Sequence, residues 1–151
     1  MKNEKTFAVL GGGSWATAIV KMLTGNDYKV GWYMRNTDAI NHIKTHRNNP
    51  NYLSSVEFPI NLLDLSSDIN HIINSYDVLI FAIPSAFLNT ELKKLTASFD
   101  GKIIFSAIKG IVPESSLIVG EHFHKTYDVP FESIGCLLYT SPSPRDKIHD
   151  L

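Results

Sequence analysis

Three consecutive glycines near the N-terminus, Gly11 to Gly13, constrain this chain more than any other feature. The apolar run Phe7–Leu10 precedes them. Apolar residues at helical spacing follow them, namely Ala16, Ile19, Val20 and Leu23. A short strand, a glycine turn and a helix in this order are typical of a dinucleotide-binding site. The opening segment therefore predicts an α/β fold that binds a nucleotide at its first turn.

Each position of the turn has its own physical role. Gly11 permits a tight turn, and Gly13 lets the backbone approach a pyrophosphate that a side chain would hold off. Ala16 stands where a small residue lets the helix pack closely on the strand. The free N–H groups around Ser14 and Trp15 lie at the positive end of the helix dipole. We expect Gly11, Gly13, Ser14 and Trp15 to bind the cofactor.

Strand and helix patterns alternate along the rest of the chain. Apolar stretches predict strands at residues 29–34, 77–83, 102–107 and 131–138. Helical patterns occur at residues 38–46, 62–74, 87–95 and 113–122, the last with Pro113 as its first residue. This alternation implies an α/β domain with a doubly wound parallel sheet, a Rossmann-like NAD(P)-binding domain over residues 1–135.

The composition argues against several other classes of protein. The formal net charge of −1 provides no electrostatic case for binding nucleic acid. Cys136 is the single cysteine, so an intrachain disulfide and a cysteine-rich metal site are excluded. No uninterrupted apolar segment is long enough for a signal peptide or a membrane span. We expect a cytoplasmic protein that binds a small molecule, with no nucleic acid, no integral membrane segment and no metal.

Two basic residues follow predicted strands. Arg35 comes about twenty residues after the glycines, where a strongly NAD-selective site carries Asp or Glu. A basic group there can meet the 2′-phosphate of NADP, so we favour a cofactor role over a solvated side chain and expect NADP or NAD as cofactor. Lys109 follows the strand at residues 102–107, where it could bind a phosphate or polarise a carbonyl. An ordinary surface lysine fits Lys109 equally well.

The histidines do not predict a metal site. His42 and His46 have the spacing of metal ligands on a helix, but no intervening Glu and no third ligand accompany them. An exposed polar helix is the better interpretation. His122 and His124 are two residues apart and would point in different directions on a helix.

Five ordered motifs together resemble the bacterial-type NAD(P)-dependent glycerol-3-phosphate dehydrogenases. They are G-G-G-S-W-A-T-A (11–18), Arg35, N-P-N-Y-L (49–53), I-P-S (83–85) and K-G-I-V-P-E (109–114). The resemblance covers about residues 5–135. It implies interconversion of sn-glycerol 3-phosphate and dihydroxyacetone phosphate by hydride transfer with NAD(H) or NADP(H), in phospholipid biosynthesis.

The resemblance also implies roles for single residues. Ser14 and Trp15 would contact the cofactor phosphates, and Arg35 would contact the adenosine ribose or its phosphate. Lys109 would lie between the nicotinamide and the substrate, and so would bind both.

The chain departs from the family in two places. Ala16 replaces the usual glycine of G-x-G-S-W-G-T-A, a change that the packing argument tolerates. From Cys136 the chain reads C-L-L-Y-T-S-P-S-P-R where the family has G-P-x-x-A-x-E. We expect residues 136–151 to be an atypical, disordered tail, and we hypothesise a frameshift or a sequence-assembly junction there. The family's helical substrate domain, with its general acid/base lysine, is then missing. We assign no catalytic residue and expect the chain alone to be inactive.

Two other functions fit the same residues. One is a non-catalytic nucleotide-binding module. The other is the cofactor domain of a different two-domain dehydrogenase, against which K-G-I-V-P-E and N-P-N-Y-L argue. The preference between NAD and NADP stays open, as does whether the parent protein is a homo-oligomer.

Overall fold

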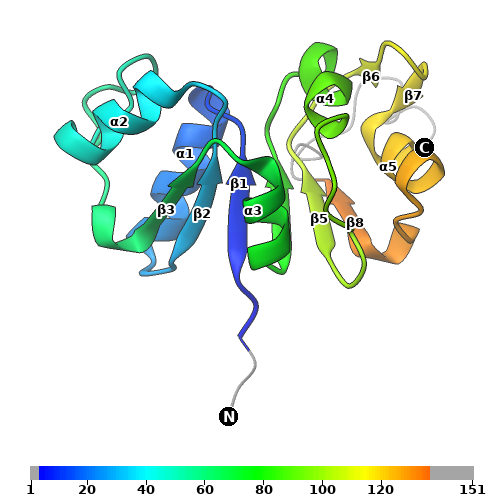
Figure 1. Cartoon of the computed structure of the whole chain (residues 1–151), viewed down its shortest axis with the longest axis horizontal. Helices are drawn as coiled ribbons and strands as arrows, with labels where there is room; N and C mark the ends of the chain where they lie inside the picture. Colours follow the sequence, from blue (N-terminus) through cyan, green and yellow to red (C-terminus); the bar gives the residue numbers. More distant parts are fainter. Residues whose placement is uncertain (1–3, 137–151) are drawn as a thin grey trace, which may run out of the picture.

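The fold is built on a six-stranded parallel sheet. The computed structural model describes residues 4–136. The strands are β1 (Phe7–Leu10), β2 (Val30–Tyr33), β3 (Leu63–Ser66), β4 (Val78–Phe81), β5 (Ile103–Ser106) and β8 (Ile134–Cys136). They lie in the order β3-β2-β1-β4-β5-β8, and every neighbouring pair is parallel. The direction in which strands are added therefore reverses between β1 and β4 (Figure 1).

Helices cover both faces of this sheet, as the doubly wound prediction requires. They are α1 (Ser14–Gly25), α2 (Thr37–His46), α3 (Ile69–Ser75), α4 (Ser85–Leu92) and α5 (Val119–Tyr127). Side chains of β1 alternate between the faces: Ala8 and Leu10 pack in one apolar cluster and Val9 in the other. The first cluster takes in α3, α4 and α5, and the second takes in α1 and α2.

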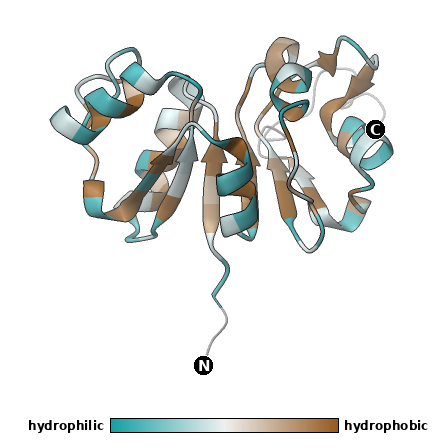
Figure 2. Cartoon of the chain, viewed as in Figure 1, coloured by the Kyte–Doolittle hydropathy of each residue, from teal (hydrophilic) through white to brown (hydrophobic). Residues whose placement is uncertain are grey.

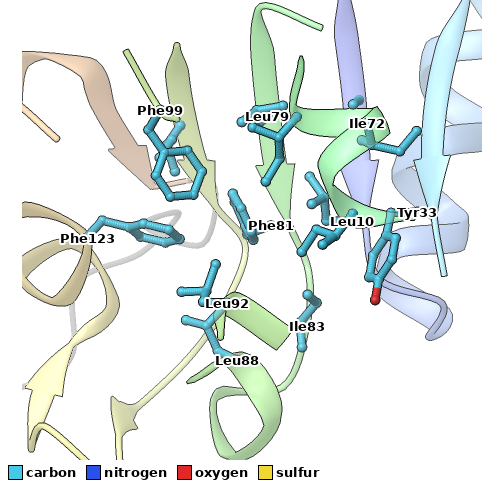
Figure 3. Packing of buried hydrophobic residues seen from close by; sticks show 14 of the residues in the cluster. Leu10, Tyr33, Ile72, Leu79, Phe81, Ile83, Leu88, Leu92, Phe99 and Phe123 are labelled. Atoms are coloured by element: carbon cyan, nitrogen blue, oxygen red, sulfur yellow. The ribbon is translucent and has the colours of Figure 1, made fainter. Parts of the chain in front are cut away.

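Aromatic side chains form the centre of the larger cluster. The rings of Phe81 and Phe123 lie 4.9 Å apart between centroids, and those of Phe99 and Phe123 lie 5.6 Å apart (Figure 3). Phe81 and Phe123 are completely buried. The hydropathy colouring shows the same arrangement, with apolar strands inside and polar residues on the helices (Figure 2). This packing joins α5 to the sheet.

Most predicted elements are confirmed. The strands expected at residues 29–34, 77–83 and 102–107 correspond to β2, β4 and β5. The helices expected at 38–46 and 87–95 correspond to α2 and α4, which begin one and two residues earlier. The strand expected at 131–138 is β8, preceded by the short 3₁₀ helix Phe131–Ser133. Cys136 ends β8, and the rest of the expected tail lies outside the described residues.

The single helix predicted at residues 62–74 is wrong. The segment forms strand β3 and then the shorter helix α3. In β3, Leu63 and Leu65 alternate with polar residues and pair with β2. The side chain of Asp68 then accepts hydrogen bonds from the amides of Asn70 and His71, which begins the helix there.

The helix predicted to begin at Pro113 is also wrong. Residues 111–118 form an antiparallel hairpin of β6 (Ile111–Val112) and β7 (Leu117–Ile118), and α5 begins only at Val119. The amide of Ser115 donates to the carbonyl of Val112, 3.2 Å away, so Pro113 occupies the second position of a turn. Proline suits that position because its φ is already fixed near the required value.

Candidate functional site

The reversal of strand order between β1 and β4 creates the candidate site. Helix α1 follows β1 on one face, and α4 follows β4 on the other. The loops at the carboxyl ends of these strands therefore diverge, which leaves a crevice between them. In Figure 1 this edge of the sheet carries α2 on one side and α4 on the other. Two adjoining clefts lie along it.

The glycine turn at this edge contains two glycines with different roles. Gly11 has φ +135°, and a Cβ there would lie 2.5 Å from the carbonyl oxygen of Ala82. The backbone itself thus requires glycine at this position. Gly13 has φ −82°, and a Cβ there would meet nothing within 4 Å. Neither backbone strain nor contact within the protein therefore excludes a side chain at Gly13.

The first cleft, which we call the Arg35 cleft, has a volume of about 320 Å³. Its walls come from the glycine turn, the end of β2, the loop after α2, and the start of α4. The guanidinium carbon of Arg35 lies 5.4 Å from the centre of the Phe87 ring. Arg35 is exposed and Phe87 is half-exposed, so a cation and an aromatic face are both presented to a ligand.

A buried carboxylate also borders the Arg35 cleft. Glu91 accepts a hydrogen bond of 3.2 Å from the hydroxyl of Tyr33, and its other oxygen pairs with Lys94. Burial, together with the charge of Glu91, raises the pKa of Tyr33 well above its usual range. Tyr33 therefore stays neutral and remains a hydrogen-bond donor. The Arg35 cleft thus holds one exposed positive charge and one buried, paired negative charge.

The second cleft, which we call the Lys109 cleft, has a volume of about 440 Å³. Ser14 and Trp15 from the start of α1 line it, together with Lys109 from the loop after β5. Lys109 is exposed, and Gly110 beside it has φ +88°, a conformation that favours glycine. The structure thus brings the start of α1 and Lys109 to one cavity.

The two clefts are continuous. Both are bordered by Gly13, Tyr52, Ile83 and Pro84. Gly13 therefore stands at the junction, with Arg35 on one side of it and Lys109 on the other. An elongated ligand with two different ends that occupies both clefts would pass along these shared residues, with Gly13 among them.

The histidines lie apart from both clefts. The rings of His42 and His46 are 4.5 Å apart on α2, and no group of three or more metal-ligating side chains occurs among residues 4–136. His122 is buried, and its Nδ1 lies 3.0 Å from the Ser115 hydroxyl. Burial lowers its pKa, so His122 is neutral near pH 7.

Several residues that line the clefts carried no specific sequence signal. Phe87 and Glu91 reach the Arg35 cleft because α4 turns toward it. Asn51 and Tyr52 lie in the N-P-N-Y-L motif, which bears on the family resemblance but indicates no contact by itself. Their position depends on the loop after α2 folding back over the glycine turn.

The strand order, the glycine turn and the paired clefts define a dinucleotide-binding α/β domain of the Rossmann type. Residues 6–137 match the family described as NAD-dependent glycerol-3-phosphate dehydrogenase N-terminus. The chain belongs to this family. It is 30% identical over 137 residues to a glycerol-3-phosphate dehydrogenase [NAD(P)+] of Pseudomonas syringae, a match that covers 91% of this chain and 39% of that protein.

Solved structures with similar folds include two enzymes of the same name. The glycerol-3-phosphate dehydrogenase of Saccharomyces cerevisiae matches with a TM-score of 0.74 at 19% identity, over 89% of this chain and 41% of that one. The enzyme of Plasmodium falciparum matches with a TM-score of 0.68 at 25% identity, over 87% and 39%. The yeast likeness supports the fold alone. The chain therefore spans about two fifths of these proteins.

Proposed function

We propose that this chain binds NAD(H) or NADP(H) across the two clefts and is the cofactor-binding part of a glycerol-3-phosphate dehydrogenase. Family membership and the continuity of the clefts at Gly13 support the proposal. An NAD(P) molecule has an adenosine end and a nicotinamide end joined by a pyrophosphate. It matches two unlike clefts joined at a glycine.

The residues of each region suit one part of the cofactor. The amides at the start of α1, near Ser14 and Trp15, would hold the pyrophosphate at the positive end of the helix dipole. Arg35 and Phe87 would hold the adenosine part, with Arg35 available to a 2′-phosphate. Lys109 would lie near the nicotinamide and could bind an anionic substrate group.

The proposed reaction interconverts sn-glycerol 3-phosphate and dihydroxyacetone phosphate. The bound nicotinamide would supply or accept the hydride. Lys109 would attract the substrate's phosphate or polarise its carbonyl. We assign no general acid/base among the described residues. A role in glycerophospholipid biosynthesis and a cytoplasmic location are part of this proposal and follow from the family.

The proposal depends most on one observation, which is that Gly13 borders both clefts. A side chain there would cause neither backbone strain nor a clash within the protein, and it would stand at a position that borders both clefts. Gly13→Val should therefore leave the chain folded and stop it from binding the cofactor. The test is an equilibrium titration of both proteins with NADH and with NADPH, together with circular dichroism and thermal unfolding without ligand.

Gly25→Val is the matched control. A Cβ at Gly25 also meets nothing within 4 Å, and Gly25 ends α1 away from both clefts. This variant should bind like the wild type. Unchanged affinity in a folded Gly13→Val variant, or no binding by the wild type, would overturn the proposal.

A further inference from the structure

Each carbonyl of the glycine turn accepts a hydrogen bond from a buried side chain. The indole Nε1 of Trp32 donates to the carbonyl oxygen of Gly11 at 2.7 Å. The side-chain amide of Asn49 donates to the carbonyl oxygen of Gly12 at 3.2 Å, and the hydroxyl of Thr17 donates to that of Gly13 at 2.6 Å. The three donors come from β2, the loop after α2, and α1. All three are at most 1% exposed.

These bonds fix the direction of two peptide groups and reinforce that of a third, because the carbonyl oxygen of Gly13 also accepts from the backbone amide of Thr17 at 3.0 Å as α1 begins. In a planar trans peptide, the C=O of one residue and the N–H of the next point in opposite directions. A carbonyl of Gly11 held toward Trp32 therefore turns the amide of Gly12 away from the protein interior. The same relation turns the amides of Gly13 and Ser14 outward. Within residues 4–136, no hydrogen bond uses the amide of Gly12 or Gly13.

Asn49 connects the turn to the clefts through both ends of its side chain. Its Nδ2 donates to Thr17 Oγ1 at 3.0 Å as well as to Gly12. Its Oδ1 accepts from the backbone amide of Asn51 at 3.0 Å. Asn51 and the neighbouring Tyr52 line the Arg35 cleft, and Tyr52 lines the Lys109 cleft as well. One buried side chain thus couples the glycine turn to the loop that borders both clefts.

We propose that Trp32, Thr17 and Asn49 are positioning residues that hold the glycine turn ready for a pyrophosphate. They keep three carbonyl oxygens, which would repel an anion, directed into the protein. They thereby direct three N–H groups toward the ligand before it arrives. This inference rests on the proposed function, because it assumes that the ligand of the turn is a pyrophosphate.

The test compares two ligands, ADP and adenosine, on the 151-residue chain. Thr17→Val keeps a similar shape and removes one hydroxyl, which donates to Gly13 and accepts from Asn49. Trp32→Phe removes the indole donor and leaves a smaller aromatic ring in the core. Each should weaken ADP binding roughly tenfold, the effect of about one net hydrogen bond, and should change adenosine binding by less than about twofold. Thr17→Ser keeps the hydroxyl and should restore ADP affinity. A general loss of structure would instead weaken both ligands together.

Asn49→Asp removes both donors of the side chain at nearly constant size. It also adds a negative charge, so Asn41→Asp on the exposed face of α2 serves as the charge-matched control. We expect ADP binding to weaken in Asn49→Asp and to remain unchanged in Asn41→Asp. Wild-type ADP affinity in folded Thr17→Val and Asn49→Asp variants would overturn the inference.

Hydrogen exchange of the unmodified chain tests the same inference even if the variants fail to fold. Without any ligand, the indole N–H of Trp32 and the side-chain amide of Asn49 should be protected from hydrogen exchange. Rapid exchange of both would show that the turn is not preorganised. If the wild type binds ADP but these groups exchange rapidly, only this inference fails. If the groups are protected but neither ADP nor NADPH binds, the proposed function fails.

Discussion

The guanidinium group of Arg35 lies over the ring of Phe87 at the border of the Arg35 cleft, with its carbon 5.4 Å from the ring centre. Arg35 follows β2 and Phe87 lies in the first turn of α4, on the two sides of the strand-order reversal. This pair leaves a positive charge where a carboxylate would favour NAD. The cofactor preference of the chain should therefore depend on Arg35.

We expect the chain to bind NADPH at least as well as NADH. Arg35→Ala should weaken NADPH binding about tenfold or more, because a charge-assisted contact with the 2′-phosphate is lost, and should weaken NADH binding less. Lys44→Ala removes an exposed charge on α2 outside both clefts and is the control. Equal weakening of the two cofactors by Arg35→Ala would show that Arg35 does not contact the 2′-phosphate.

Gly11 and Gly13 should respond differently to the same small substitution. Gly11→Ala forces a side chain into positive φ and against the carbonyl of Ala82, which we expect to cost about 1–3 kcal/mol of folding free energy or more. Gly13→Ala should change the free energy of unfolding by less than about 0.5 kcal/mol. Urea denaturation of both variants measures the difference. Equal destabilisation would contradict the distinct roles of the two glycines.

Asp64 in β3 should stabilise the fold in a pH-dependent way. Burial alone would raise its pKa, but hydrogen bonds with Tyr76 at 2.8 Å and His71 at 2.9 Å outweigh burial and lower the pKa below its usual value. A lowered folded-state pKa contributes stability above the unfolded pKa of about 4, and that contribution disappears as the pH falls through the folded pKa.

The variant Asp64→Asn measures this contribution. At pH 6 it should lower the free energy of unfolding by about 1 kcal/mol, because Asp64 is partly exposed and its bonds are screened. The difference from the wild type should shrink as the pH falls below about 4. Asp100→Asn, which changes an exposed carboxylate before β5, should show no such difference. A pH-independent effect of Asp64→Asn would contradict this role.

Phe123 should be a main contributor to the stability of the larger core. Its ring contacts those of Phe81 and Phe99 and is completely buried. Phe123→Ala should cost about 3–5 kcal/mol in the free energy of unfolding, because it leaves a cavity between α5 and the sheet. Phe131→Ala removes a ring that is 55% exposed and should cost much less. Similar costs for the two variants would contradict the assignment of the core.

The sequence predicted those strands and helices that are determined by residues close together along the chain. The apolar run Phe7–Leu10, the glycines and the periodic residues after them predict β1, the turn and α1 without reference to distant segments. β3 has four residues, and half of them are polar, so its strand character depends on pairing with β2. Pro113 fits a first helical turn and a β-turn equally well, and only the pairing of Ile111 with Ile118 distinguishes them.

The candidate site shows the same difference between residues indicated by local sequence and residues placed by distant segments. The sequence order relative to strand ends indicated Arg35 and Lys109, because the carboxyl ends of parallel strands meet at one edge. Phe87 could not be predicted, because it lies in a helix whose rotation is determined by the packing of Leu88 and Leu92 in the core. Asn49 was missed because its partners, Gly12 and Thr17, are more than thirty residues away.

The central claim is that NADPH binds across both clefts. NMR chemical-shift mapping of the backbone amides of the ¹⁵N-labelled chain during titration with NADPH tests this claim most directly. We predict the largest shifts at Gly12, Gly13 and Ser14, with further shifts at Arg35 in one cleft and Lys109 in the other. The amide resonances of Thr6 and Asp77 should not shift. These two residues lie at the opposite edge of the sheet, where the Thr6 amide donates to the Asp77 carboxylate and the Asp77 amide donates to the carbonyl and hydroxyl oxygens of Thr6. Shifts restricted to that opposite edge, or no shifts at saturating NADPH, would contradict the account.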